Sequence, residues 1–304
     1  MRSADAGAIV VLDGGLATEL ETRGFDLSDR LWSARLLLTD PAAIEDVHLD
    51  YFRAGAEVAT TASYQASVPG FAATGIDRET ALRLIALSVE VAARARDRYR
   101  AETADDRTLR IAGSVGPYGA FLADGSEYRG DYAPGPPALA AFHRPRIEAL
   151  LEAGVDLLAF ETIPTVREAE VLVRLLGELG ATAWLSYSCR DGRSTAAGEP
   201  IAAAVAIGNE PGIVAVGVNC TAPRHLPALL AAARDATDRP LIAYPNAGDR
   251  WDATTRRWVT DSGGGFVPAD VASWTALGAT WLGGCCGTGP PEIATLASLV
   301  AATD

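Results

Sequence analysis

Short runs of apolar and β-branched residues recur along the whole chain, and each run ends in polar residues or glycine. Apolar side chains occupy consecutive positions in these runs instead of alternating with polar ones, which is typical of strands buried on both faces of a parallel sheet. We expect eight such strands, over residues 9–13, 57–62, 110–115, 156–161, 182–188, 213–219, 240–244 and 279–284.

Segments with helical periodicity lie between these strands. The first begins at Asp40-Pro41, where the Asp40 side chain can cap the helix and proline suits the first helical position. Ile44, Val47 and Tyr51 then follow at the spacing of one apolar helix face. Further helices are expected over roughly residues 78–100, 137–153, 166–179, 199–209, 223–236, 268–277 and 290–302.

Eight strands that alternate with helices predict an α/β fold, a (β/α)₈ TIM barrel, with a doubly wound open sheet as the alternative. No linker or internal repeat divides the chain, so we expect one domain over residues 1–304. Long polar connections follow three of the strands, at residues 14–40, 116–136 and 245–267. In a barrel all three lie on the carboxyl-terminal rim, where active sites form.

The charge balance narrows the classes of partner. The net charge is −13, every basic residue is arginine, and no basic stripe interrupts the acidity, which speaks against a nucleic-acid partner. No apolar stretch is long enough to span a membrane, and the amino-terminal residues lack the apolar core of a signal peptide. We therefore expect no membrane association and a cytoplasmic location.

Three of the four cysteines follow the predicted strands at 213–219 and 279–284. Cys220 comes directly after the strand at 213–219, and Cys285 and Cys286 follow the strand at 279–284. Because parallel strands of a barrel end at the same mouth, these thiols can converge on one ion. Thiolates suit zinc, and a catalytic zinc commonly keeps three protein ligands and one open position. The simpler alternative is a pair of small buried residues.

Two other residues are potential metal ligands by type, His225 and Cys189. His225 lies on the opening turn of the helix that follows Cys220, and Cys189 follows the strand at 182–188. We expect neither to bind the metal, and we interpret Cys189 as a spare buried thiol.

The chain resembles the homocysteine S-methyltransferase family over about residues 8–300. The resemblance is carried by separate motifs in the family's order. They are LDGGLATEL at 12–20, LWSA at 31–34, TTASYQ at 60–65, GSVGPYG at 113–119, LADGSEY at 122–128, FETIP at 160–164, YPNAG at 244–248 and the two cysteine motifs. The most similar branch uses S-methylmethionine or S-adenosylmethionine as the methyl donor.

The resemblance implies roles for individual residues. Cys220, Cys285 and Cys286 would bind zinc, with the homocysteine sulfur at the fourth position, so no catalytic residue is expected beyond this site. Glu161 would hold the amino group of homocysteine. A carboxylate directly after an apolar strand is also more often a pocket group than a surface charge.

Further contacts are implied on both sides of the pocket. Asp13, Gly14, Gly15 and Thr61 would meet the amino-acid end of homocysteine, although Asp13 can also be read as a turn residue. Trp32 would face the sulfonium of the donor, since aromatic faces attract such cations. Tyr118 and Tyr244 are weaker candidates for this contact.

The resulting hypothesis is an enzyme that methylates the homocysteine thiol and forms methionine. Two alternatives remain open: a methyltransferase for selenocysteine or another small thiol, and a zinc-binding or sensing protein without catalysis. Small molecules are the expected partners, and the chain could be a monomer or a homodimer.

Overall fold

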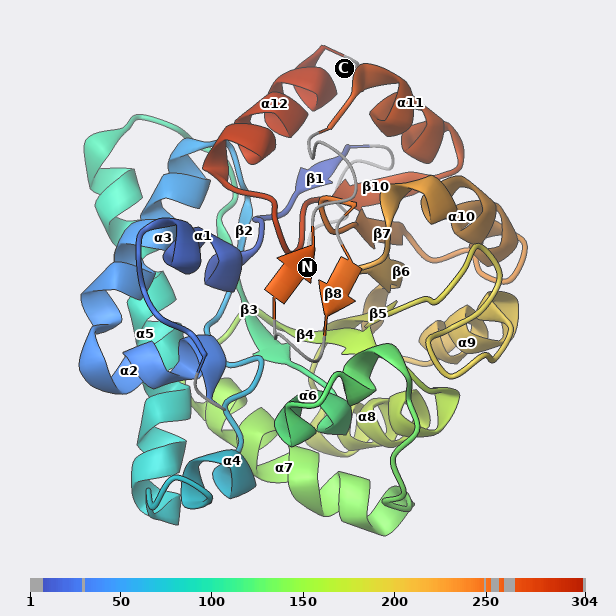
Figure 1. The fold of residues 1–304 in the computed structure, drawn as a ribbon. Coiled ribbons are helices and arrows are strands. Elements are labelled where there is room, and N and C mark those ends of the chain that lie inside the picture. Colours follow the sequence, from blue (N-terminus) through green and yellow to red (C-terminus); the bar gives the residue numbers. More distant parts are fainter. Residues whose placement is uncertain (1–7, 29–30, 249, 253–256, 260–265, 303–304) are drawn as a thin grey trace.

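The computed structural model describes residues 8–28, 31–248, 250–252, 257–259 and 266–302. Eight parallel strands form one sheet in the order β1-β10-β7-β6-β5-β4-β3-β2. A parallel bridge between Leu12 and Val58 joins the two edges, so the sheet closes into a barrel (Figure 1). The strands are β1 (Val10–Val11), β2 (Val58–Thr60), β3 (Arg110–Val115), β4 (Leu157–Ile163), β5 (Ala183–Tyr187), β6 (Ile213–Asn219), β7 (Leu241–Tyr244) and β10 (Ala279–Leu282).

Helices that follow the strands surround this barrel (Figure 1). They are α3 (Pro41–Arg53), α5 (Arg78–Glu102), α7 (Pro136–Glu152), α8 (Val166–Leu179), α9 (Ile201–Ala206), α10 (Leu226–Arg234), α11 (Pro268–Ala276) and α12 (Pro290–Ala301). The predicted (β/α)₈ barrel is confirmed, because consecutive strands are neighbours around the ring and the open-sheet alternative requires a different order. No helix in the described part of the chain is long and apolar enough to cross a membrane.

The sequence correctly predicted where α3 begins and which of its faces is buried. The Asp40 carboxylate accepts a hydrogen bond from the Ala43 N–H at 3.2 Å, as expected for the residue that precedes α3. Ile44, Val47 and Tyr51 are fully buried, so the apolar face predicted from their spacing is the one that packs inward.

The connections on the carboxyl-terminal rim contain short elements that the sequence did not predict. They are α1 (Leu16–Thr22), η1 (Trp32–Arg35), α2 (Leu36–Thr39), α4 (Val68–Ala72), α6 (Tyr118–Leu122), η2 (Ser126–Tyr128) and the hairpin of β8 (Arg250–Asp252) with β9 (Arg257–Val259). Each has seven residues or fewer, which is too short to establish a periodic apolar pattern. The short helices η3 (Ile207–Asn209) and η4 (Pro223–His225) fall within the helices predicted over 199–209 and 223–236.

Large side chains fill the barrel interior and support the site above it. Trp184 is fully buried in the inner core with Leu12, Ala112 and Ile242. Its indole Nε1–H donates a hydrogen bond to the Tyr244 hydroxyl at 2.9 Å, near the carboxyl end of β7. The filled barrel therefore forms a rigid floor for groups at the strand ends.

Candidate metal centre and substrate pocket

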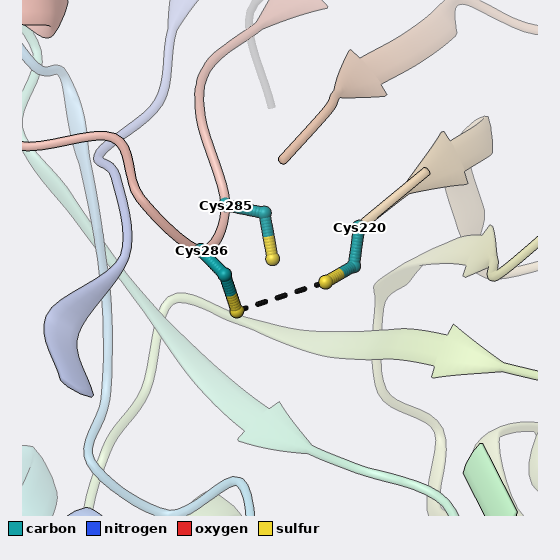
Figure 2. Close-up of side chains that lie close together, drawn as sticks. All are labelled: Cys220, Cys285 and Cys286. Carbon is teal, nitrogen blue, oxygen red and sulfur yellow. Dashed lines mark hydrogen bonds between the residues drawn. The ribbon is translucent and has the colours of Figure 1, made fainter. Parts of the chain in front are cut away.

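The three cysteines predicted to converge do so. The sulfur atoms of Cys220, Cys285 and Cys286 all lie within 4.8 Å of one another, and the Cys220 and Cys286 sulfurs are 3.7 Å apart. Figure 2 shows the three side chains pointing toward a common point from two strand ends. The alternative of a merely packed cysteine pair does not account for this third thiol.

The strand between the two cysteine-bearing strands fixes their positions. The Cys220 N–H donates to the carbonyl oxygen of Tyr244 at 3.0 Å, and the Cys285 N–H donates to that of Pro245 at 2.8 Å. Both cysteine segments are therefore hydrogen-bonded to the carboxyl end of β7, and their spacing is set by the backbone.

Backbone strain is concentrated around this centre. Among the described residues, four non-glycine residues have positive φ: Trp32, Ala123, Thr162 and Cys220, at 50°, 55°, 59° and 44°. All four line the same cavity. Such conformations persist only where the surroundings impose them, and they cluster at functional sites.

The cavity above the cysteines has a volume of about 900 Å³. Five carboxylate side chains line it, and no Lys, Arg or His is found among its described lining residues. The acidic residues are Asp13, Glu21, Asp26, Glu127 and Glu161. A cavity with this lining attracts cationic groups and disfavours anionic ones.

Glu161 lies at the cavity floor, within β4. One carboxylate oxygen accepts a hydrogen bond from the Ser114 hydroxyl, and the other accepts one from the Tyr244 hydroxyl at 3.3 Å. Burial raises the pKa of Glu161 to about 7 although both hydrogen bonds oppose this shift. A cationic ligand would stabilise its ionised form.

Asp13 faces the same region from the end of β1. Its carboxylate accepts hydrogen bonds from the Thr60 N–H at 2.6 Å and the Thr60 hydroxyl at 2.9 Å. Burial raises the pKa of Asp13 to about 8, and the nearby Glu161 carboxylate contributes to the same shift. These hydrogen bonds join β1 to β2, so Asp13 is more than a turn residue. The two carboxylates form an acidic pair without a described basic partner in the cavity.

The other residues predicted for the amino-acid end also line the cavity. The Gly15 N–H already donates to the Thr288 carbonyl oxygen at 2.9 Å. A Cβ on Gly14 would lie 2.3 Å from that same oxygen, so only glycine allows this close approach. Thr61 is buried, and its hydroxyl lies 2.7 Å from that of Ser63.

The aromatic candidates separate into two groups. Trp32 lines the cavity and packs edge-on against Tyr64, with ring centroids 6.1 Å apart. Tyr244 also lines it, with its hydroxyl turned toward Glu161. Tyr118 is not a lining residue and packs against Phe142 at 5.0 Å, so the structure does not support it as a donor contact.

The sequence analysis did not predict two residues that line the cavity, although both belong to the LADGSEY motif at 122–128. Glu127 and Tyr128 belong to η2, in the connection after β3, and both line the cavity. The Tyr128 hydroxyl lies 3.3 Å from the Cys220 sulfur. Burial raises the pKa of Glu127 to about 7. The sequence signal was the match of the LADGSEY motif to the family, to which no role had been attached.

The thiol cluster has the donor chemistry of a soft-metal site. The pKa of Cys220 is lowered because Cys285 and Cys286 donate hydrogen bonds to its sulfur, whereas the pKa of Cys286 is raised. Without a cation the buried cluster therefore favours one thiolate over three. Two thiolates on a tetrahedral zinc, each about 2.3 Å from the metal, are about 3.8 Å apart, which fits the observed sulfur separation.

The two residues that were set aside are outside the described metal-ligand cluster. Neither Cys189 nor His225 belongs to it, and neither lines the cavity. Burial raises the pKa of the Cys189 thiol, so this side chain stays protonated and unreactive.

Comparison with known proteins connects this geometry to a family. The sequence profile of the homocysteine S-methyltransferase family matches residues 10–300. The chain belongs to the homocysteine S-methyltransferase family. The homocysteine S-methyltransferase of Escherichia coli (strain K12) is 49% identical to it, covering 96% of this chain and 95% of that protein.

Relatives with different names align with nearly the whole chain. The crystal structure of the homocysteine methyltransferase MmuM from Escherichia coli, metallated form, superposes with a TM-score of 0.88 at 47% identity and covers 97% of both chains. A selenocysteine Se-methyltransferase of Brassica oleracea var. italica is 44% identical, covering 95% of this chain and 88% of that protein. The expected family and barrel are confirmed, and the chain is a methyltransferase of this family.

Proposed function

We propose that this chain transfers a methyl group from a sulfonium donor, S-methylmethionine or S-adenosylmethionine, to the thiol of homocysteine, which forms methionine. The observation that carries the proposal is a three-thiol centre open to a cavity lined by carboxylates and by no described basic side chain. The thiols suit a metal that binds the acceptor sulfur, and the carboxylates suit the cationic groups of both substrates.

We assign the metal as zinc and its ligands as Cys220, Cys285 and Cys286. Their sulfur donors and spacing fit this ion, and the cavity leaves one side of the centre accessible. When bound, zinc would supply a deprotonated acceptor thiol at neutral pH, which a free thiol with a pKa near 8.5 cannot provide in quantity.

The protein's own groups would orient homocysteine over this centre. Glu161 and Asp13 receive its ammonium group, and Thr61 with the backbone of Gly14 and Gly15 meets its carboxylate end. Pairing with the ammonium also removes the energetic cost of holding two buried carboxylates close together.

The donor would approach from the side of Trp32, whose ring attracts the sulfonium. The acceptor sulfur forms a bond to the donor methyl carbon while the bond from that carbon to the sulfonium sulfur breaks. The electron pair stays on the donor sulfur, which becomes a neutral thioether. Alignment of the three reacting atoms in a water-poor cavity supplies much of the rate.

The proposal is tested by assaying the purified protein with homocysteine and each donor, with and without prior treatment with a zinc chelator. We expect methionine to form only with the untreated or zinc-reconstituted protein. Turnover that survives complete metal removal would contradict the assignment of the metal.

A pH dependence follows from the acidic pair. The pKa values of Asp13 and Glu161, about 8 and about 7, exceed their unfolded values of 3.8 and 4.5. The ligand-free protein therefore loses stability from these groups as the pH rises from about 4 to about 8. A bound ammonium group restores this stability because it pairs with the two carboxylates. Methionine carries that ammonium but has no thiol proton that could itself titrate. We therefore expect methionine to raise the melting temperature more at pH 8 than at pH 6. A shift equal at both pH values would contradict this pairing.

A second acceptor has specific support. The similarity to a selenocysteine Se-methyltransferase makes selenocysteine an alternative substrate of the same centre. Comparing turnover of homocysteine and selenocysteine with one donor would rank the two. A non-catalytic zinc sensor would instead show a metal without an exchangeable position.

We further propose that residues 1–304 act as one homocysteine-binding domain. A cytoplasmic location suits a centre whose three free thiols must stay reduced. Size-exclusion chromatography with light scattering would distinguish a monomer from a homodimer.

A further inference from the structure

One carboxylate of the cavity has a buried oxygen atom without a hydrogen-bond partner in the described structure. Glu127 is only 8% exposed, and its Oε2 atom is buried without a hydrogen-bond partner. An ionised group in such a position is costly unless a cation neutralises it. The residue lines the cavity, so a ligand there can supply that cation.

The other two buried carboxylates of the cavity are different. Asp13 accepts two hydrogen bonds from Thr60, and Glu161 accepts hydrogen bonds from Ser114 and Tyr244. Those groups orient the two carboxylates toward a ligand that itself carries hydrogen-bond donors. Glu127 lacks such an arrangement of partners.

The nearest basic residue in the sequence, Arg129, lowers the pKa of Glu127 through its charge but forms no ion pair with it in the described structure. Arg129 is exposed, and its guanidinium pairs with Asp131 at 3.0 Å and with Asp124 at 3.6 Å. No ion pair joins it to Glu127 in the described structure.

The backbone holds Glu127 firmly in this position. Its carbonyl oxygen accepts a hydrogen bond from the Ser188 hydroxyl at 2.8 Å. A Cβ on Gly119 would lie 2.6 Å from the Glu127 nitrogen, so the turn of the chain depends on that glycine. Glu127 is therefore built into the cavity wall and is not a mobile rim charge.

Its place in the wall is close to the reacting groups. The next residue, Tyr128, places its hydroxyl 3.3 Å from the Cys220 sulfur. Glu127 lies close enough to the Cys220 thiol for Cys220 to raise the Glu127 pKa, and Glu127 contributes to the raised pKa of Tyr64. Tyr64 in turn packs against Trp32, the aromatic residue expected on the donor side.

We propose that Glu127 is a specificity-determining residue that faces the sulfonium of the methyl donor and selects cationic over neutral thioethers. This inference rests on the proposed function and adds a residue to it. A sulfonium has no N–H groups to donate, so a carboxylate with a buried oxygen that lacks a hydrogen-bond partner suits it through charge alone. Methyl transfer leaves a neutral thioether, which Glu127 then holds less tightly, and this favours release of the product.

The test compares two ligands that differ by one methyl group on sulfur and by the positive charge that it creates. S-Methylmethionine and methionine share their amino and carboxylate groups, and without homocysteine neither is consumed. Calorimetric titration of the metal-loaded protein is expected to show at least tenfold tighter binding of S-methylmethionine. In Glu127→Gln this ratio is expected to fall to within about threefold of unity, with the affinity for methionine changed less than twofold.

A matched variant controls for the nonspecific loss of one negative charge near Glu127. Asp131→Asn removes one charge from an exposed position on the same connection that does not line the cavity, and it is expected to keep the wild-type ratio. Glu127→Gln removes an unpaired buried charge, so its melting temperature is expected to equal or exceed that of the wild type.

Several results would overturn the inference. The first is equal affinity of the wild-type protein for S-methylmethionine and methionine. The second is a Glu127→Gln variant that still binds S-methylmethionine at least tenfold more tightly. The third is equal weakening of both ligands in this variant, which would assign Glu127 to the ammonium group that they share. If the wild-type protein methylates homocysteine and any of these results is obtained, the role of Glu127 is contradicted and the proposed function is not. Absence of that turnover, with a Glu127-dependent preference intact, would instead contradict the proposed acceptor.

Discussion

Replacing Cys286 with serine is expected to lower methyl transfer at least about a thousandfold, which corresponds to about 4 kcal/mol in the activation free energy. A serine hydroxyl does not ionise as a thiol does and is a poor ligand for zinc, so the centre would lose one of its three sulfurs. Metal analysis of the purified variant should show a stoichiometry well below one per chain, and kcat/KM should fall with it.

The chain supplies a matched control for this substitution. Cys189→Ser removes a thiol that is outside the described cluster and does not line the cavity. We expect its metal content and kcat/KM to remain within about twofold of the wild type, because this thiol contacts neither the cluster nor the cavity. Equal loss in both variants would mean that the cluster has no special role.

Replacing Glu161 with glutamine is expected to raise the KM for homocysteine by about tenfold to a hundredfold. The carbonyl oxygen of glutamine can accept a hydrogen bond from one of the two hydroxyls of Ser114 and Tyr244, and its amide group can donate to the other, but glutamine lacks the charge that pairs with the ammonium. A hydrogen bond to a charged group contributes about 1.5–3 kcal/mol, which gives this range. Steady-state kinetics with homocysteine varied at saturating donor measures the effect.

The metal content of the same variant separates binding from damage to the centre. Glu161→Gln should retain its zinc, and the KM for the donor should change little. It should also be as stable as the wild type or more so at pH 8, because burial raises the pKa of Glu161 and its charge destabilises the ligand-free fold. An unchanged KM for homocysteine would exclude Glu161 as the ammonium partner.

The sequence was sufficient to predict the barrel because its strands and outer helices carry strong patterns. The predicted helix over 166–179 coincides with α8, and the predicted strands at 110–115 and 213–219 coincide with β3 and β6. Burial on both faces makes each strand a continuous apolar run. The hairpin of β8 and β9 was not predicted, since three-residue strands offer too few positions for a pattern.

The site was only partly accessible to the same reasoning. Cys220 and the cysteine pair could be placed together because parallel strands end at one rim. Glu127 and Tyr128 could not, because a short 3-10 helix in a long connection decides where they point. That helix begins after Gly125, which has a φ of 80°, and such loop geometry depends on contacts far apart in sequence.

The central claim is a zinc ion bound by Cys220, Cys285 and Cys286, with a fourth position for the acceptor sulfur. X-ray absorption spectroscopy at the zinc edge, before and after addition of homocysteine, measures its coordination directly. We predict three sulfur neighbours at about 2.3 Å and one lighter atom in the free protein, and four sulfurs once homocysteine is bound. A shell that stays unchanged on addition of homocysteine, or one with fewer than three sulfurs, would contradict the account.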